Sequence, residues 1–396
     1  MNSRNNLPSS TPFTPTLTSR LPAVGTTVFT RMSTLAVQAN AVNLGQGFPD
    51  FACERSLLQA VNDAMQADFN QYPMMSGAPV LRNAIAAKIA ALYGHQYDVN
   101  SEITVTAGAT QALTTAILCC VHPGDEVVVI EPSYDSYVPA ITLAGGVPVL
   151  VQMEAGADGY TVPWSKVAAA VNGKTRLIVI NTPHNPTGSV LRVADMDALA
   201  DIVRGTDVLI LSDEVYEHMV YDGARHESVC RYPELAARAF VVSSFGKTYH
   251  VTGWKVGYVA APAALMAEFR KVHQYNVFTV NTPMQHGIAS YMADPKPYLE
   301  LPAFYQRKRD LFRAGLKGSR FELLPADGTY FQCVRYDKIS SQTEAEFAEW
   351  LTTEIKVAAI PVSAFYQQGK ESGIVRFCFA KQDETLALAL ERLGKV

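Results

Sequence analysis

The chain has 396 residues, of which 48% are hydrophobic and 18% are charged, and its formal net charge at pH 7 is −4. This length is more than one compact core usually supports, so we expect two domains, and the composition excludes a disordered or fibrous chain. The small negative charge offers no basic surface for nucleic acid, and the lack of any run of 18 apolar residues argues against a membrane-spanning helix.

The N-terminal segment predicts an irregular arm. Residues 1–20 are rich in Ser, Thr, Pro and Asn and lack the apolar core of a secretory signal. Three arginines precede the first acidic residue, Asp50, as in an organelle transit peptide, but four prolines would disrupt the amphipathic helix that such a peptide needs. The six cysteines show no C-x-x-C spacing, so we expect free thiols and a reducing, cytoplasmic location.

Between residues 102 and 260, short apolar segments alternate with helical patterns. This alternation predicts a mostly parallel sheet covered by helices on both faces. Ligands of such sheets bind at the carboxyl ends of the strands, so polar residues that follow the strands should converge. The strand candidates are residues 103–106, 126–130, 175–180, 208–211, 240–243 and 256–260.

After residue 297 the pattern changes to that of a smaller α+β domain. Its helix candidates are residues 306–316, 344–355 and 384–393, and its strand candidates are residues 330–334 and 375–379.

Polar motifs follow the strands of the first region. AGATQAL (residues 107–113) opens a helix whose first amides, at Ala109 and Thr110, can face an anion, and it lacks the G-x-G-x-x-G spacing of a dinucleotide site. The later motifs are NTPHNPTG (181–188), ILSDEVY (210–216), SSFGKT (243–248) and TGWKVG (252–257).

The residue types in these motifs predict a pyridoxal phosphate site. Lys247 would bind the cofactor's carbonyl and later move a proton at the substrate's Cα, while Lys255 would clamp the phosphate. Asp213 would pair with the protonated pyridine nitrogen, and such ion pairs shift a pKa by roughly 1 to 3 units. Asn185 and Tyr216 would hydrogen-bond the cofactor's phenolic oxygen.

The chain resembles the fold type I pyridoxal phosphate-dependent aminotransferases of class I and II. The resemblance lies in the order of an asparagine, an aspartate with a tyrosine, and a lysine, each placed after an apolar strand. The resemblance extends from about Ser19 onward. It implies an α/β fold with a large cofactor-binding domain built on a mostly parallel sheet (residues 50–297) and a small C-terminal α+β domain (298–396). An N-terminal arm (1–49) would pack with the small domain.

The same resemblance implies further contacts to the cofactor. Ser244 would complete the phosphate site with Lys255, and Tyr134 would stack on the pyridine ring. Tyr72 matches a family tyrosine that reaches the phosphate of the neighbouring subunit, so a homodimer with shared active sites is expected.

An amino acid substrate also presents a carboxylate, which arginine recognises through two parallel hydrogen bonds. Arg376 stands in the apolar strand IVRFCF (374–379), where an unpaired charge would be costly, and is therefore the best candidate. NLGQGFPDF (43–51) resembles the family's mobile substrate segment, which places Gly47 near the same carboxylate.

The expected substrate side chain is neutral. Family members that act on dicarboxylic acids add a second arginine from the partner subunit, but the matching residues 273–285 contain no Arg or Lys. Phe29, Phe278 and Tyr134 would instead line a pocket for a thioether or aromatic group.

We therefore expect an aminotransferase that converts an amino acid into a 2-oxo acid without a metal. The resemblance is greatest to the methionine aminotransferases and to the kynurenine aminotransferase and glutamine transaminase K group. Methionine, phenylalanine, glutamine and kynurenine remain open as donors. A carbon–sulfur β-lyase that acts on cysteine S-conjugates is the alternative, whereas a DNA-binding regulator would need a helix-turn-helix region that the Pro-rich arm does not provide.

Overall fold

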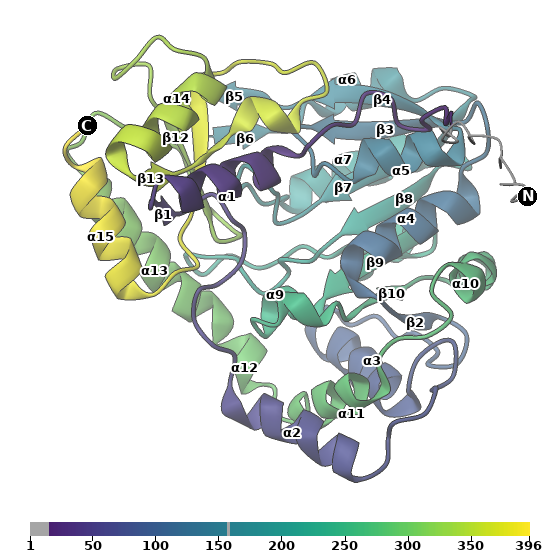
Figure 1. Ribbon diagram of the computed structural model, residues 1–396. Helices are drawn as coiled ribbons and strands as arrows, with labels where there is room; N and C mark the ends of the chain where they lie inside the picture. Colours follow the sequence, from purple (N-terminus) through teal and green to yellow (C-terminus); the bar gives the residue numbers. More distant parts are fainter. Residues whose placement is uncertain (1–15, 157–158) are drawn as a thin grey trace, which may run out of the picture.

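The computed structural model describes residues 16–156 and 159–396 (Figure 1). The first fifteen residues of the expected arm lie outside the described residues. The largest sheet has seven strands in the order β2-β10-β9-β8-β7-β3-β4. These strands are β2 (Ile103–Thr106), β3 (Glu126–Glu131), β4 (Val147–Gln152), β7 (Thr175–Asn181), β8 (Leu209–Asp213), β9 (Ala239–Ser244) and β10 (Gly257–Ala260).

Neighbouring strands of this sheet are parallel except at β10, which is antiparallel to both β2 and β9. The mostly parallel α/β sheet predicted from the sequence is therefore confirmed. Because β10 runs against the others, its first residue lies at the edge where they end. The segment that precedes β10 can thus reach the same site as the segments that follow the other strands.

Helices cover both faces of the seven-stranded sheet (Figure 1). Val127 and Val129 of β3 belong to the apolar core on one face, and Val128 and Ile130 to the core on the other. Burial on both sides explains why these strands read as continuous apolar runs. The helices are α4 (Gly108–Cys120), α5 (Tyr137–Ala144) and α10 (Ala263–Asn276) on the first face, and α3 (Pro79–Tyr93), α6 (Trp164–Ala170) and α7 (Val193–Val203) on the second.

A second sheet has four antiparallel strands in the order β11-β12-β15-β14. Phe312, Phe347 and Phe377 are fully buried in the separate core between this sheet and its helices. The elements are β11 (Glu322–Leu323), β12 (Phe331–Arg335), β14 (Ile360–Pro361), β15 (Ile374–Cys378), α13 (Leu301–Leu316), α14 (Glu344–Trp350) with a π-helical continuation (Leu351–Ile355), and α15 (Asp383–Leu393).

The described part of the N-terminal segment packs against this second unit. Helix α1 (Val28–Gln38) contacts β13 (Val357–Ala358), and β1 (Val42–Asn43) pairs with β13 in parallel. The sequence did not predict α1, which begins where the Thr27 side chain accepts a hydrogen bond from Thr30 N. The domain boundaries at residues 49 and 297 stay a prediction.

Shorter elements complete the fold. Helix α2 (Arg55–Gln66) packs against α11 (Thr282–Tyr291). The remaining elements are α8 (Pro233–Ala236), α9 (Phe245–Thr248), α12 (Lys296–Leu299), β5 (Glu154–Gly156), β6 (Gly159–Thr161) and the 3-10 turns Val229–Arg231, Thr252–Trp254 and Val362–Phe365. Across the described ranges, no helix is both long and apolar enough to cross a membrane, and all six cysteines are free.

Candidate active site

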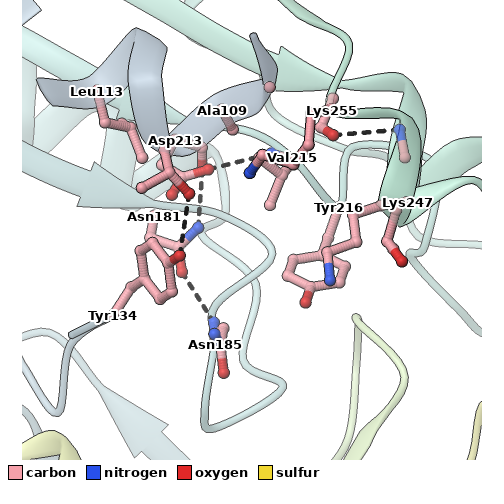
Figure 2. A pocket seen from close by; sticks show the side chains of 15 residues that line it. Ala109, Leu113, Tyr134, Asn181, Asn185, Asp213, Val215, Tyr216, Lys247 and Lys255 are labelled. Carbon is pink, nitrogen blue, oxygen red and sulfur yellow. Dashed lines mark hydrogen bonds between the residues drawn. The ribbon is translucent and has the colours of Figure 1, made fainter. Parts of the chain in front are cut away.

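A cavity of about 180 Å³ lies at the carboxyl edge of the seven-stranded sheet (Figure 2). Its walls come from segments far apart in the sequence, each next to the end of a strand or, at β10, before its start. The lining residues are Gly108, Ala109, Thr110, Leu113, Tyr134, Asn181, Asn185, Asp213, Val215, Tyr216, Ser244, Gly246, Lys247, Thr252 and Lys255. The structure thus brings together all the predicted cofactor contacts except Tyr72.

Asp213 is the last residue of β8 and only 3% exposed. Its carboxylate accepts hydrogen bonds from the Tyr137 hydroxyl at 2.7 Å and from Val215 N at 3.3 Å. Burial raises the pKa of Asp213 to about 6, although the hydrogen bond from Tyr137 opposes this. Among the described residues, no Lys, Arg or His lies within ion-pair distance of this carboxylate. A cationic group of a ligand would therefore stabilise its charged form.

Lys247 lies in the one-turn helix α9, which Ser244 caps by accepting a hydrogen bond from Gly246 N. Lys247 Nζ donates to Gly47 O at 2.9 Å and to the Tyr330 hydroxyl at 2.8 Å. Burial lowers the pKa of this amine to about 8. A fraction of Lys247 is therefore neutral near pH 7 to 8 and able to attack a carbonyl.

The opposite end of the cavity suits an anion. Helix α4 begins at Gly108, so the N–H groups of Ala109 and Thr110 belong to its first turn and lack helical partners. Gly108 has a φ of +76°, and an added Cβ there would lie 3.3 Å from Lys255 Nζ. Among the described residues, no carboxylate lies within 4.0 Å of Lys255 Nζ. The positive end of the α4 dipole and the Lys255 ammonium therefore both attract an anion to the same end of the cavity.

Close backbone packing creates this arrangement. At Gly257, the first residue of β10, an added Cβ would meet Ser243 O at 2.7 Å and Gly108 C at 3.1 Å. Any larger residue would push β10 away from α4. The glycine therefore keeps Lys255 beside the start of the helix.

Arg376 lies in the middle of β15, is 1% exposed, and is buried without a carboxylate partner among the described residues. Its Nη1 donates to Asn185 Oδ1 at 2.6 Å and its Nη2 to Gly45 O at 3.1 Å, while Nε is buried without a partner. The guanidinium lies 3.8 Å from the centroid of the Phe331 ring. Burial lowers its pKa, and a ligand carboxylate would compensate the buried charge.

The predicted substrate contacts divide into two groups. Gly47 contacts Lys247 as described, and the Phe29 ring centroid lies 5.6 Å from the Arg376 guanidinium. Phe278 lies outside the cavity of its own chain, as does Tyr72. These two rings instead pack on each other, with centroids 5.3 Å apart, and are 40% and 81% exposed.

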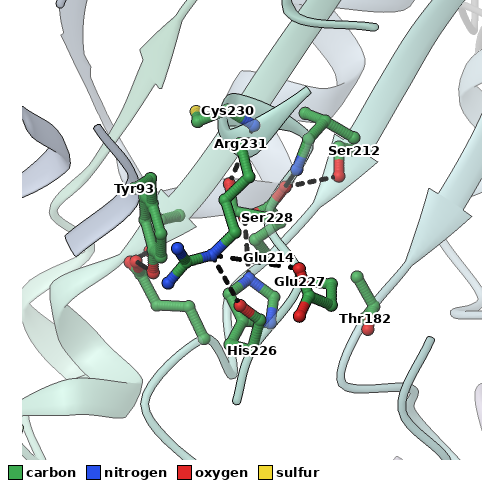
Figure 3. Close-up of polar contacts among 12 residues, drawn as sticks. Tyr93, Thr182, Ser212, Glu214, His226, Glu227, Ser228, Cys230 and Arg231 are labelled. Carbon is green, nitrogen blue, oxygen red and sulfur yellow. Dashed lines mark hydrogen bonds and ion pairs between the residues drawn. The ribbon is translucent and has the colours of Figure 1, made fainter. Parts of the chain in front are cut away.

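Two buried glutamates anchor the turn that carries Asp213 and Tyr216 from behind. Glu214 accepts hydrogen bonds from His226 Nε2 and Ser212 Oγ, both at 2.8 Å (Figure 3). Glu217 forms a buried ion pair with Lys88 at 2.6 Å. Neither glutamate lines the cavity, so these contacts hold the turn in position from outside the site.

Three residues near the reacting groups were missing from the sequence-based list. Tyr137 donates to Asp213, and the Tyr330 hydroxyl accepts from Lys247 Nζ and donates to Gly47 O. Asn181 connects two motifs, since its Nδ2 donates to Asp213 O and its Oδ1 accepts from Asn185 N, both at 2.8 Å. Asn181 opens the NTPHNPTG motif and could have been identified from its strand-end position, whereas Tyr137 and Tyr330 carry no motif.

Comparisons with known proteins agree on one family. The model of "Aminotransferase class I and II" matches residues 39–393. A methionine aminotransferase of Escherichia coli (strain K12) is 49% identical over 96% of this chain and 98% of its own. A kynurenine–oxoglutarate transaminase of Dictyostelium discoideum is 35% identical over 94% of both chains. The crystal structure of YbdL from Escherichia coli, reported with a methionine aminotransferase function, has a TM-score of 0.94 at 48% identity and covers 97% of this chain and 100% of that chain.

The burial of Asp213 should make the ligand-free protein less stable as the pH rises. Its pKa of about 6 in the folded state exceeds the ordinary value of 3.8, so the folded state holds this proton more tightly than the unfolded state. The free energy of unfolding should therefore fall between about pH 4 and pH 6, by about 3 kcal/mol in total, and level off above that. Asp213→Asn removes this titration, so the free energy of unfolding of the variant should rise relative to that of the wild type over the same pH range.

Chemical denaturation at pH 4, 5, 6 and 7 measures the difference. Asp222→Asn is the matched control, because hydrogen bonds from Arg309 lower the pKa of Asp222. Removal of the Asp222 carboxylate should therefore lower the stability relative to the wild type as the pH rises. An advantage of Asp213→Asn that shrinks with rising pH would contradict the assignment.

Proposed function

The chain belongs to the class I and II aminotransferases, and we propose that it is a homodimeric, cytoplasmic, pyridoxal phosphate-dependent enzyme that transfers the amino group of a neutral, thioether or aromatic L-amino acid to a 2-oxo acid. Methionine is the best candidate donor, followed by phenylalanine, glutamine and kynurenine. The observation that carries the proposal is a set of three charged groups without ion-pair partners among the described residues, two lining one cavity and the third hydrogen-bonded to Asn185 in its wall. These are the Asp213 carboxylate, the Lys247 amine and the Arg376 guanidinium.

The residues present fit pyridoxal phosphate, which the class I and II family generally uses. Asp213, a buried carboxylate without a cation among the described residues, suits a protonated ring nitrogen. The start of α4, with Ser244 and Lys255, suits a phosphate. When bound, the cofactor supplies a carbonyl that takes up the substrate's amine and a ring that accepts electrons from the substrate's Cα.

Three groups would orient and tune the ring. Asn185 Oδ1 already accepts from Arg376, so its Nδ2 is left to donate to the phenolic oxygen, as is the Tyr216 hydroxyl. Tyr134, whose hydroxyl lies 3.1 Å from Thr110 Oγ1, would stack on the ring from its position in the cavity wall. Each contact disfavours any other orientation of the ring.

Lys247 would serve as the covalent anchor and as the acid and base. Its lowered pKa allows Nζ to lose and regain a proton near neutral pH, which a lysine of ordinary pKa does poorly. Nζ would take the proton from the substrate's Cα and return it to the adjacent carbon of the cofactor. Tyr330 and Gly47 O hold the amine when it is not bonded.

Arg376 would bind the substrate's α-carboxylate through its planar guanidinium. Its contacts to Asn185 and Gly45 O pre-orient it, and three of its five N–H groups make no hydrogen bond to the described residues. Phe29 lies beside it and would contact the substrate's side chain. Residues 273–285 contain no lysine or arginine to pair with a second carboxylate, which favours a neutral side chain.

The exposed surface around Tyr72 and Phe278 supports the homodimer. Large exposed apolar residues occur on α2, on the segment that follows it, at the start of α3, and at and just after the end of α10: Leu58, Met65, Phe69, Tyr72, Met74, Val80, Tyr275 and Phe278. Such surfaces are characteristic of protein interfaces. Phe278 also has a φ of +69°, which is costly for a bulky residue and is typical of functional positions. In the dimer both rings would enter the partner's cavity, Tyr72 at the phosphate and Phe278 beside the substrate.

Borohydride treatment of the purified protein should bleach a visible absorption band and fix the cofactor to Lys247. The reason is that Lys247 is the lysine that faces Asp213 and Tyr216 with a lowered pKa. Peptide mapping by mass spectrometry locates the label. Lys255→Ala is the control and should retain the label on Lys247, whereas a label on another lysine, or none, would overturn the assignment.

Substrate choice should favour neutral side chains. Methionine or phenylalanine should give a kcat/KM at least tenfold above that of aspartate with the same 2-oxo acid, about 1.4 kcal/mol of transition-state discrimination. Initial rates on a panel of amino acids measure this, and equal efficiency with aspartate would exclude it. Release of pyruvate from a cysteine S-conjugate without any 2-oxo acid, faster than transamination, would favour the β-lyase instead.

The shared active site predicts complementation between two inactive variants. Random exchange of Lys247→Ala chains with Tyr72→Ala chains makes about half of the dimers hybrid, and each hybrid has one site with both residues intact. About a quarter of wild-type activity should return, provided that Tyr72→Ala alone is severely impaired. Lys247→Ala mixed with Asp213→Asn is the control and should recover nothing, since both residues act in the same chain. No recovery with Tyr72→Ala either would show that Tyr72 does not act across the interface.

A further inference from the structure

Two exposed loops that are distant in the sequence form one unit on the surface. Residues 70–78 present Tyr72 and residues 277–282 present Phe278, and the two rings pack edge to face. Thr282 Oγ1 also donates to Gln71 O at 2.6 Å. The tips of the loops are therefore in contact, although neither lies in the cavity of its own chain.

Gln285 connects the bases of the same two loops. It lies in the second turn of α11 and is 0% exposed. Its Oε1 accepts a hydrogen bond from Ala78 N at 2.7 Å, and its Nε2 donates to Val280 O at 2.8 Å. One amide thus uses its acceptor on the first loop and a donor on the second. A carboxylate has no donor and a hydrocarbon has neither, so glutamine is specifically suited to this bridge.

The backbone of the first loop packs tightly around the Gln285 side chain. At Gly77, whose φ is +101°, an added Cβ would lie 2.4 Å from Val105 Cγ2 and 3.0 Å from Gln285 Oε1. Val105 N in turn donates to Ser76 O at 3.0 Å, which fixes the base of the first loop to β2. The Gln285 bridge is therefore attached to the seven-stranded sheet through β2, whereas the loop tips with Tyr72 and Phe278 are exposed.

We infer that Gln285 is a positioning residue for the active site of the neighbouring subunit. By joining residues 70–78 to residues 277–282, it sets the distance between Tyr72 and Phe278 and makes the two rings enter the partner's cavity as one unit. This inference rests on the proposed homodimer with shared sites. It implies that the grip on the phosphate and the contact to the substrate's side chain are mechanically coupled through a residue that touches neither.

Hydrogen exchange of the purified full-length protein tests the bridge without relying on activity. Gln285→Met keeps the volume and removes both hydrogen bonds, so the Ala78 amide should exchange at least tenfold faster while the amides of the seven-stranded sheet stay unchanged. Gln332→Met is the matched control. Gln332 is also 0% exposed and also hydrogen-bonds the backbone, its Nε2 donating to the carbonyls of Leu324 and Cys333, but it lies on β12. Its loss should leave Ala78 unaffected.

Mixed dimers test whether Gln285 acts across the interface. Gln285→Met alone should lower kcat/KM for methionine at least tenfold. Mixing it with Lys247→Ala should return about a quarter of wild-type activity, because the intact site then takes Lys247 from one chain and Gln285 from the other. Mixing Gln332→Met with Lys247→Ala should return only the activity that Gln332→Met itself supports. Gln285→Glu, which keeps an acceptor for Ala78 N but removes the donor to Val280 O, gives the same activity test if Gln285→Met does not fold.

The exchange and mixing experiments distinguish failure of the inference from failure of the proposed dimer. Three outcomes would overturn the inference: unchanged exchange at Ala78, a fully active Gln285→Met protein, or a loss of activity that Lys247→Ala chains do not rescue. The proposed dimer with shared sites would still stand, provided that Tyr72→Ala is rescued in parallel. Failure to rescue Tyr72→Ala would instead refute the shared site and the inference with it. A wild-type protein without transaminase activity would refute the proposed function, while the exchange at Ala78 would still report on the bridge.

Discussion

Burial of a carboxylate without a cation partner among the described residues is the constraint on which the rest of the site depends. Asp213 ends β8 inside the protein, and its raised pKa measures what burial costs its charged form. The surrounding structure maintains this position. Tyr137 satisfies one carboxylate oxygen, Asn181 holds the backbone oxygen, and Glu214 and Glu217 anchor the following turn from behind. A site organised in this way is prepared for a cationic ring before any ligand binds.

The reversed direction of β10 gives the site its second lysine. If β10 ran parallel to its neighbours, the segment before it would lie at the far edge of the sheet, away from α4. Because it is antiparallel to β2 and β9, Lys255 lies beside the start of α4 and Lys247 lies after β9 at the same edge. Gly108 and Gly257 permit the close backbone approach that this geometry requires.

Arg376 links the two sheets at the cavity. It projects from β15 of the second sheet to Asn185, which follows β7 of the first, and to Gly45 of the N-terminal segment. The groups proposed to bind the cofactor and the substrate are thus in direct contact. Tyr72 and Phe278 do not line this cavity and pack on each other, so in the proposed dimer a second subunit would complete the site.

The sequence by itself was sufficient for the fold class and for most of the predicted residues that line the cavity. Strands buried on both faces read as apolar runs, and in a parallel sheet the residues that follow such strands must converge, so Asn185, Asp213, Tyr216 and Lys247 could be identified before their positions were known. Strands of two residues, such as β1 and β13, contain too few positions to show a period, and the sequence did not predict them.

Only the tertiary structure decided which side chains support these residues. Tyr137 and Tyr330 belong to no motif, and their contacts to Asp213 and Lys247 join segments 76 and 83 residues apart. The bridge made by Gln285 to Ala78 spans 207 residues. The direction of β10 and the pairing of Tyr72 with Phe278 are likewise set by packing between distant segments. Local sequence records the preference of each segment for a helix or strand, but such contacts arise only when the folded chain brings distant segments together.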